Sequence, residues 1–190
     1  MAEGKLFYVI GPSGSGKDSL MRYGRERLAS DPGVVFAHRY ITRPVELHWE
    51  NHIALTEAEF DARLAAGLFA MHWRSHGLRY GIGREINLWL AKGCNVVVNG
   101  SREYLQEARR LYPTLTAVFV TVSPEVLAAR LRARGRETEE QIAERIVRAR
   151  QFMRPEGPLE IIENDADLEV AGERFVQLLT HAALPVWGST

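Results

Sequence analysis

The sequence predicts an α/β fold of three layers, a parallel β-sheet with helices on both faces. Two observations support this prediction. Apolar runs typical of strands alternate with amphipathic runs typical of helices over most of the 190 residues, an alternation that favours a parallel sheet. The first apolar run, from Lys5 to Ile10, leads directly into a glycine-rich loop and then into a helix. This order of elements indicates where a ligand would bind.

The glycine-rich loop has the Gly-x-x-x-x-Gly-Lys spacing of a P-loop. Its glycines let successive backbone N–H groups converge on phosphate oxygens, and the next helix directs its positive dipole end toward them. Lys17 can reach the β- and γ-phosphates as a point charge. We therefore predict a P-loop NTPase fold whose ATP-binding residues are Gly11, Pro12, Ser13, Gly14, Ser15, Gly16, Lys17, Asp18 and Ser19.

The residue after the lysine departs from the commonest P-loop pattern. A hydroxyl that binds Mg²⁺ usually follows the lysine, but here Asp18 follows it and Ser19 comes one residue later. Nucleoside monophosphate kinases have their hydroxyl at this later position, which points to that branch of the fold. Bound phosphates would repel Asp18 unless a metal ion or an arginine intervened. We expect Ser19 and Asp18 to lie beside Mg²⁺.

Composition excludes several functional classes. Lys plus Arg equals Asp plus Glu at 24 each, so the positive charge expected of a duplex-binding protein is missing. No stretch is long and apolar enough to span a membrane, and the chain begins without a signal-peptide pattern. Cys94 is the only cysteine, which fits a reducing cytoplasm. We expect a cytoplasmic enzyme with a small-molecule substrate and no nucleic-acid or membrane partner, and the oligomeric state stays open, a homodimer included.

The order of elements divides one kinase domain, residues 1–190, into a core, an insertion and a lid. In the insertion, the sequence predicts short antiparallel strands and one helix that begins at the Thr56 capping box. In the lid, the sequence predicts two helices joined at Gly135. In the core, we expect Ser101 to cap the helix that Pro113 ends. The expected boundaries are 1–36, 84–124 and 158–190 for the core, about 37–83 for the substrate-binding insertion and about 125–157 for the lid.

The lid segment from Arg130 to Arg154 is rich in arginine. Phosphoryl transfer spreads negative charge over the moving group, and guanidinium groups on a closing lid stabilise that charge while excluding water. For most of these arginines a solvated helix face with neighbouring glutamates is the better interpretation. We expect at least two to touch phosphate and assign catalytic roles to Lys17, Arg130, Arg134 and Arg145.

Several motifs together resemble a known family. With its P-loop, Tyr40-Ile41-Thr42-Arg43-Pro44, the Tyr80-Gly81 turn, Arg134-Gly135 and Asn164-Asp165, the chain resembles the guanylate-kinase-like P-loop kinases from end to end. Four stretches resemble more closely the ribose 1,5-bisphosphate phosphokinases of phosphonate catabolism, namely residues 11–20, 38–43, 50–55 and 98–102.

The resemblance implies a reaction and a set of site residues. The γ-phosphoryl of ATP would pass to the 1-phosphate of ribose 1,5-bisphosphate, giving 5-phospho-α-D-ribose 1-diphosphate and ADP. Asn164 would lie near the adenine. The implied substrate-binding residues are Arg39, Arg43, His52, Tyr80 and Asn99. For Arg43, which precedes Pro44, a loop arginine without a ligand is the alternative.

The chain departs from the guanylate kinases where they bind GMP. Of the two arginines that hold the GMP phosphate, Arg43 keeps the first place and Glu46 occupies the second. By the same resemblance, the acid that recognises guanine falls on Met71 and an assisting hydroxyl falls on Ile82. The polar edge of guanine would stay unsatisfied against these side chains. We therefore expect GMP to be a poor substrate.

The acidic pair that guanylate kinases place after the central strand is also replaced, by Asn99 and Ser101. Asp18 is our candidate for the missing carboxylate on the metal side. Two other functions stay open, a guanylate or other nucleoside monophosphate kinase and a non-catalytic guanylate-kinase-like binding module. The intact Gly16-Lys17 and the lid arginines count against the binding module.

Overall fold

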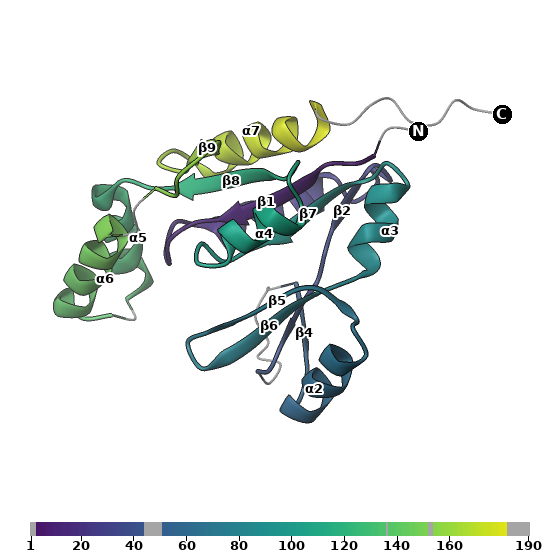
Figure 1. Cartoon of the computed structure of the whole chain (residues 1–190). Coiled ribbons are helices and arrows are strands. Elements are labelled where there is room, and N and C mark those ends of the chain that lie inside the picture. Colours follow the sequence, from purple (N-terminus) through teal and green to yellow (C-terminus); the bar gives the residue numbers. More distant parts are fainter. Residues whose placement is uncertain (1–2, 44–50, 136, 152–153, 182–190) are drawn as a thin grey trace.

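The computed structural model describes residues 3–43, 51–135, 137–151 and 154–181, whose elements form two sheets and a helical hairpin (Figure 1). The larger sheet has the order β2-β7-β1-β8-β9, and every neighbouring pair is parallel. The predicted parallel sheet is confirmed. Its strands are β1 (Leu6–Ile10), β2 (Val34–Phe36), β7 (Asn95–Asn99), β8 (Thr116–Thr121) and β9 (Glu160–Glu163).

Helices cover both faces of the larger sheet, as predicted. Phe7 and Val9 of β1 pack on one face with α1 and α7, whereas Tyr8 and Ile10 pack on the other with α3 and α4. All four side chains are at most 1% exposed. Burial on both faces explains why β1 is a continuous apolar run. The four helices are α1 (Lys17–Arg27), α3 (Glu85–Ala91), α4 (Leu105–Leu111) and α7 (Leu168–His181).

The smaller sheet lies below the larger one in Figure 1 and has the order β4-β3-β6-β5. Its β3–β6 and β6–β5 pairs are antiparallel as expected, but β3 and β4 are parallel, and Arg39 pairs with His52. The all-antiparallel expectation was wrong for this pair, because β3 and β4 run in the same direction. The elements are β3 (Arg39–Ile41), β4 (His52–Ala54), α2 (Glu57–Ala65), β5 (Phe69–Ser75) and β6 (Leu78–Gly83).

Local sequence signals set the ends of several elements. Thr56 and Glu59 form the predicted capping box at the start of α2. β5 and β6 are joined by His76 and Gly77, whose φ angles of 49° and 75° suit a two-residue hairpin turn. The Ser101 prediction was wrong, because α4 begins at Leu105 with Tyr104 at its N-cap and no side-chain cap. Ser101 instead bonds with the hydroxyl of Tyr8 through its backbone.

The helical hairpin lies at one end of the larger sheet (Figure 1). It consists of α5 (Pro124–Arg134) and α6 (Glu139–Gln151), which pack through Leu127, Leu131 and Ile142. The Ser123 side chain accepts a hydrogen bond from the Val126 N–H and so caps α5, and Gly135 ends that helix with a φ of 61°. This small core is separate from those of the two sheets.

Candidate active site

The P-loop joins β1 to α1 and leaves backbone N–H groups facing outward. Gly16 is the N-cap of α1 with a φ of 81°, and no side chain caps the helix. Its first N–H groups are therefore available to an anion. Two close approaches require glycine here, since a Cβ on Gly14 would lie 2.6 Å from Leu127 of α5 and a Cβ on Gly16 would collide with Asn164.

Asn164 binds the P-loop backbone through its side chain. Its side chain is 2% exposed, and its Nδ2 donates to the backbone oxygen of Ser15 at 2.8 Å. Its own backbone N–H donates to Thr121 at the end of β8, at 2.9 Å. The amide thus fixes the distance between the P-loop and the larger sheet. The predicted contact with adenine stays a prediction, and the observed role of Asn164 is to position the loop.

Lys17, Asp18 and Asn99 form a polar cluster beside the P-loop. The Lys17 ammonium donates to the Asn99 carboxamide oxygen and lies 3.4 Å from Asp18 Oδ1. The Asn99 Nδ2 donates to the same Asp18 oxygen at 3.1 Å. Because Asn99 ends β7, next to β1 in the sheet, it meets the P-loop at the carboxyl edge of the strands. This edge is the usual ligand site of a parallel α/β sheet.

The cluster keeps Asp18 ionised. Desolvation by burial pushes the pKa of Asp18 upward, but the charges of Lys17 and Arg39 and the hydrogen bonds from Lys17 and Asn99 outweigh it. The pKa is therefore lowered from its ordinary value of 3.8. Ser19 lies in the first turn of α1 with Asp18. A carboxylate that stays charged and a neighbouring hydroxyl are hard oxygen donors of the kind that Mg²⁺ prefers, so these residues fit the predicted metal site.

Arg130 approaches the P-loop from α5. Its Nη1 would lie 3.7 Å from a Cβ on Gly16, and its Nη2 donates to Ala166 at 3.3 Å. Arg130 is thus within reach of a bound phosphate. Arg134 is the last residue of α5, and its side chain lies outside the described part of the chain.

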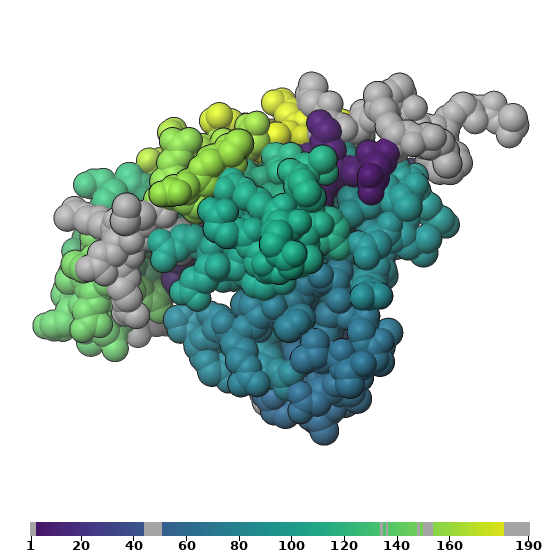
Figure 2. Space-filling view, in the orientation of Figure 1, coloured from purple at the N-terminus to yellow at the C-terminus, as the bar shows by residue number. Residues whose placement is uncertain are grey.

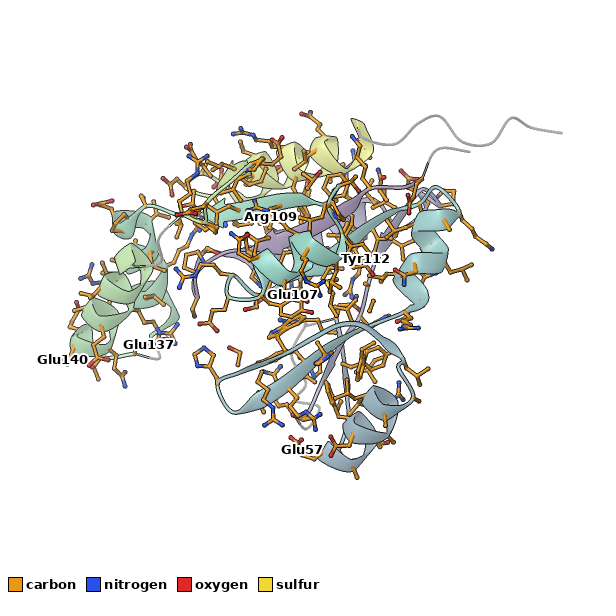
Figure 3. All side chains as sticks on the ribbon, viewed as in Figure 1. Glu57, Glu107, Arg109, Tyr112, Glu137 and Glu140 are labelled. Atoms are coloured by element: carbon orange, nitrogen blue, oxygen red, sulfur yellow. The ribbon has the colours of Figure 1, made fainter. Side chains whose placement is uncertain are left out.

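Arg145 of α6 pairs with a glutamate in this structure. Its Nη2 lies 3.0 Å from Oε1 of Glu137, whose side chain is 13% exposed. In the view of Figure 3, Glu137 lies on the side of the hairpin nearer the smaller sheet, whereas Glu140 lies on the opposite side. A phosphate that engaged Arg145 would have to compete with the Glu137 carboxylate.

The predicted acceptor residues come from both sheets, since Asn99 ends β7 of the larger sheet and the others lie on the smaller sheet or directly after β3. Arg39 opens β3, His52 opens β4 and pairs with Arg39, and Tyr80 lies on β6. Arg43 follows β3 by two residues, whereas Pro44 and Glu46 lie outside the described residues. Figure 2 shows a hollow between this blue sheet and the green hairpin. We call this hollow, which the smaller sheet and the hairpin border, the cleft.

Met71 and Ile82 lie in the core rather than at the surface of the described residues. They are register partners across β5 and β6, and their side chains are 1% and 0% exposed within the core that contains Tyr8 and Trp73. The two positions that a guanine-recognising site would use are thus apolar and buried.

The sequence analysis missed Asn51 as a positioning residue. Its Nδ2 donates to the backbone oxygens of Phe36 and Ala37, at 3.2 and 3.3 Å, where the chain passes from the larger to the smaller sheet. Asn51 also lines a small pocket with Asp18 and Asn99. The only available signal was its place next to His52 in the 50–55 stretch.

Comparison with known proteins defines the class of this fold and site. Residues 8–152 match a family model described as an AAA domain. The crystal structure of guanylate kinase from Anaplasma phagocytophilum superposes with a TM-score of 0.64 at 18% identity, covering 97% of this chain and 88% of that one. At this identity the likeness shows the fold, which is that of a guanylate-kinase-like P-loop protein. Within the described residues, no helix is both long and apolar enough to cross a membrane.

Two curated relatives define the family more closely. Ribose 1,5-bisphosphate phosphokinase PhnN of Thiobacillus denitrificans is 83% identical over 182 residues, which cover 96% of each chain. Its namesake in Psychromonas ingrahamii is 55% identical over 186 residues, covering 97% of this chain and 94% of that protein. The chain belongs to the ribose 1,5-bisphosphate phosphokinase family.

Proposed function

We propose that this protein transfers the γ-phosphoryl group of ATP to the 1-phosphate of ribose 1,5-bisphosphate, giving 5-phospho-α-D-ribose 1-diphosphate and ADP. Its membership in the kinase family and its intact P-loop support the phosphotransfer. The observation that carries the choice of acceptor is the burial of Met71 and Ile82, because two buried apolar side chains provide no hydrogen-bonding partner for guanine. We place the reaction in the cytoplasm and in phosphonate catabolism.

The donor would be held by the P-loop. The α1 N–H groups and Lys17 would bind the β- and γ-phosphates, and Asn164 would keep the loop at its place on the sheet. Asn99 accepts from the Lys17 ammonium and thereby orients it. A preformed donor site of this kind needs little reorganisation when charge develops on the transferred group.

The acceptor would be held by the smaller sheet, with Arg43 beside the 1-phosphate and His52 and Tyr80 as further substrate-binding residues. Its attacking atom is an anionic phosphate oxygen, so no general base has to remove a proton. Catalysis then consists of alignment and charge neutralisation. Arg130, Arg134 and Arg145 would stabilise the equatorial oxygens of the transferred group when the hairpin closes over the cleft, and closure would keep water from accepting the phosphoryl group.

Asp18 and Ser19 would hold Mg²⁺ together with phosphate oxygens of ATP. The ion would supply positive charge that offsets repulsion between the two substrates. Lys17 and Asn99 would keep the Asp18 carboxylate deprotonated and oriented for this contact.

Phosphorus NMR of single-substrate reactions tests the proposal. Purified protein with ATP, Mg²⁺ and ribose 1,5-bisphosphate should give a diphosphate signal coupled to C1 of ribose, and Lys17→Ala should not. GMP in place of the sugar should give little GDP. Efficient turnover of GMP would assign the protein to the guanylate kinases, and no turnover of either acceptor by the folded protein would favour a binding module.

A further inference from the structure

A guanidinium group of the smaller sheet lies over an aromatic ring. The Cζ of Arg39 lies 5.6 Å from the centroid of the Tyr80 ring. Tyr80 stacks on Trp73, with centroids 5.6 Å apart and planes at 4°, and Trp73 stacks on Tyr104. Contact with a ring uses the flat face of a guanidinium, whereas its N–H donors lie in the plane and suit phosphate oxygens. The aromatic stack therefore orients Arg39 as an anion receptor.

The charge of Arg39 reaches the phosphate site. Although desolvation raises the pKa of Asp18, Arg39 acts together with Lys17 to bring it below its ordinary value. Arg39 also opposes the rise that burial causes in the pKa of Tyr8. The charge of Arg39 therefore acts on Asp18, the residue that follows the P-loop lysine.

The strands beside Arg39 offer apolar neighbours. Arg39 pairs in register with Ile82, and Ile82 pairs with Met71. Both neighbours are fully buried. Arg39 therefore lies at the edge of a buried apolar core and next to the Tyr80 ring. Such a surrounding strengthens the attraction for an anion, because the local dielectric is low.

Two arginines flank β3 from opposite ends. Arg39 opens the strand, and Arg43 comes two residues after its last residue, Ile41. They provide two separate cationic points rather than one clamp. A pentose with a phosphate at each end needs two such points, one for the phosphate that accepts the γ-phosphoryl group and one for the phosphate that does not react.

We infer that Arg39 binds the 5-phosphate of a pentose 1,5-bisphosphate and so selects the doubly phosphorylated sugar over its monophosphates. This inference rests on the proposed function, in which the 1-phosphate is the acceptor. Arg39 is then the specificity-determining residue, and the stack of Tyr80 and Trp73 positions it. The 5-phosphate replaces the nucleobase as the group by which the enzyme recognises its acceptor.

Pairing one substitution with removal of one phosphate tests this inference. The kcat/KM for ribose 1,5-bisphosphate and for ribose 1-phosphate is measured for the wild type and Arg39→Ala. We expect the substitution to lower the value for the bisphosphate about 100-fold, as expected for lost hydrogen bonds between charged groups. The value for ribose 1-phosphate should change less than about threefold, because that acceptor has no group for Arg39 to bind.

Arg63→Ala is the matched control. Arg63 of α2 also lies over a tyrosine, with its Cζ 5.0 Å from the Tyr40 centroid, but Tyr40 packs against the core of Phe60 and Phe69, which is separate from the core that Tyr80 contacts. It should leave both kcat/KM values unchanged. Thermal melting of each variant checks the fold, and Arg39→Lys should recover part of the loss because it restores the charge without the planar donors.

Binding of ribose 5-phosphate gives a second measurement that needs no turnover. Calorimetric titration should show its Kd rising at least about tenfold in Arg39→Ala and staying constant in Arg63→Ala. Equal losses for both acceptors, or an unchanged Kd for ribose 5-phosphate, would overturn the assignment of Arg39. Failure of the wild type to use ribose 1,5-bisphosphate would instead overturn the proposed function, so the two results are distinguishable.

Discussion

The P-loop and the smaller sheet present different kinds of ligand-binding group to the substrates. In the P-loop, the ligand groups are backbone N–H groups held by glycines with positive φ and by a buried asparagine. In the smaller sheet, the ligand groups are half-buried side chains of Arg39, His52 and Tyr80 on short strands. Backbone geometry suits any nucleoside triphosphate, whereas side chains can change with the acceptor. Selectivity in this fold is thus expected on the smaller sheet.

Among changes at the P-loop, Lys17→Ala should have the largest effect. It removes the P-loop cation that we expect to bind the β- and γ-phosphates, and we expect kcat to fall about 10³-fold. A coupled assay of ADP release measures the change. Because Lys17 also contacts Asp18 and Asn99, a melting curve is needed to show that the variant is folded. Activity within threefold of the wild type would contradict the donor site proposed above.

Asn164→Ala should affect binding of ATP without affecting binding of the sugar. It removes the hydrogen bond to Ser15 and leaves the loop unsupported, so we expect the KM for ATP to rise about tenfold. The KM for the sugar should stay the same. Asn87→Ala is the control, since Asn87 accepts from Tyr112 at 2.6 Å on the surface of α3. A larger rise in the sugar KM than in the ATP KM would show that Asn164 acts on the acceptor.

Asp18→Asn should shift the Mg²⁺ dependence more than the affinity for ATP. The variant keeps the size of the side chain but lacks the charge, and we expect about a tenfold higher Mg²⁺ concentration for half-maximal rate. Asp31→Asn is the matched control, because Asp31 accepts from the Gly33 N–H in the turn after α1. An unchanged Mg²⁺ response would remove Asp18 from the metal site.

Acid stability should show the smallest effect. The pKa of Asp18 is lowered in the folded state, so its ionised form stabilises the fold at pH values above the ordinary pKa of 3.8, and that contribution is lost as pH falls through the folded-state pKa. The stability advantage of the wild type over Asp18→Asn should therefore shrink below about pH 4. We expect a small difference, because the Asp18 side chain is 58% exposed and solvent screens its contacts. Urea unfolding at pH 3 and pH 7 measures it.

Features set by neighbouring residues were predictable from the sequence. The P-loop and the capping boxes at Thr56 and Thr138 depend on spacings of a few residues, and all three are present. The parallel pairing of β3 and β4 and the late start of α4 were not predictable, because they depend on chain reversal and on packing rather than on a local signal.

In the candidate site, too, local motifs were predictable and the contacts between distant residues were not. The sequence placed Lys17 and Asn99 in different motifs, 82 residues apart, and only the pairing of β1 with β7 brings them into contact. Asn164 lies 149 residues from Ser15, whose backbone it holds. The position of Arg39 beside Ile82 depends on strand register, which no motif encodes. Long-range pairing therefore determines how the predicted residues act on one another.

A competition experiment tests the central claim most directly. Equal concentrations of ribose 1,5-bisphosphate and GMP are mixed with limiting ATP, Mg²⁺ and the protein, and phosphorus NMR measures both products in one spectrum. Our account predicts the C1 diphosphate of ribose in excess over GDP by at least about 100-fold, since a guanine edge left unsatisfied weakens binding by several kcal/mol. GDP as the main product would contradict it.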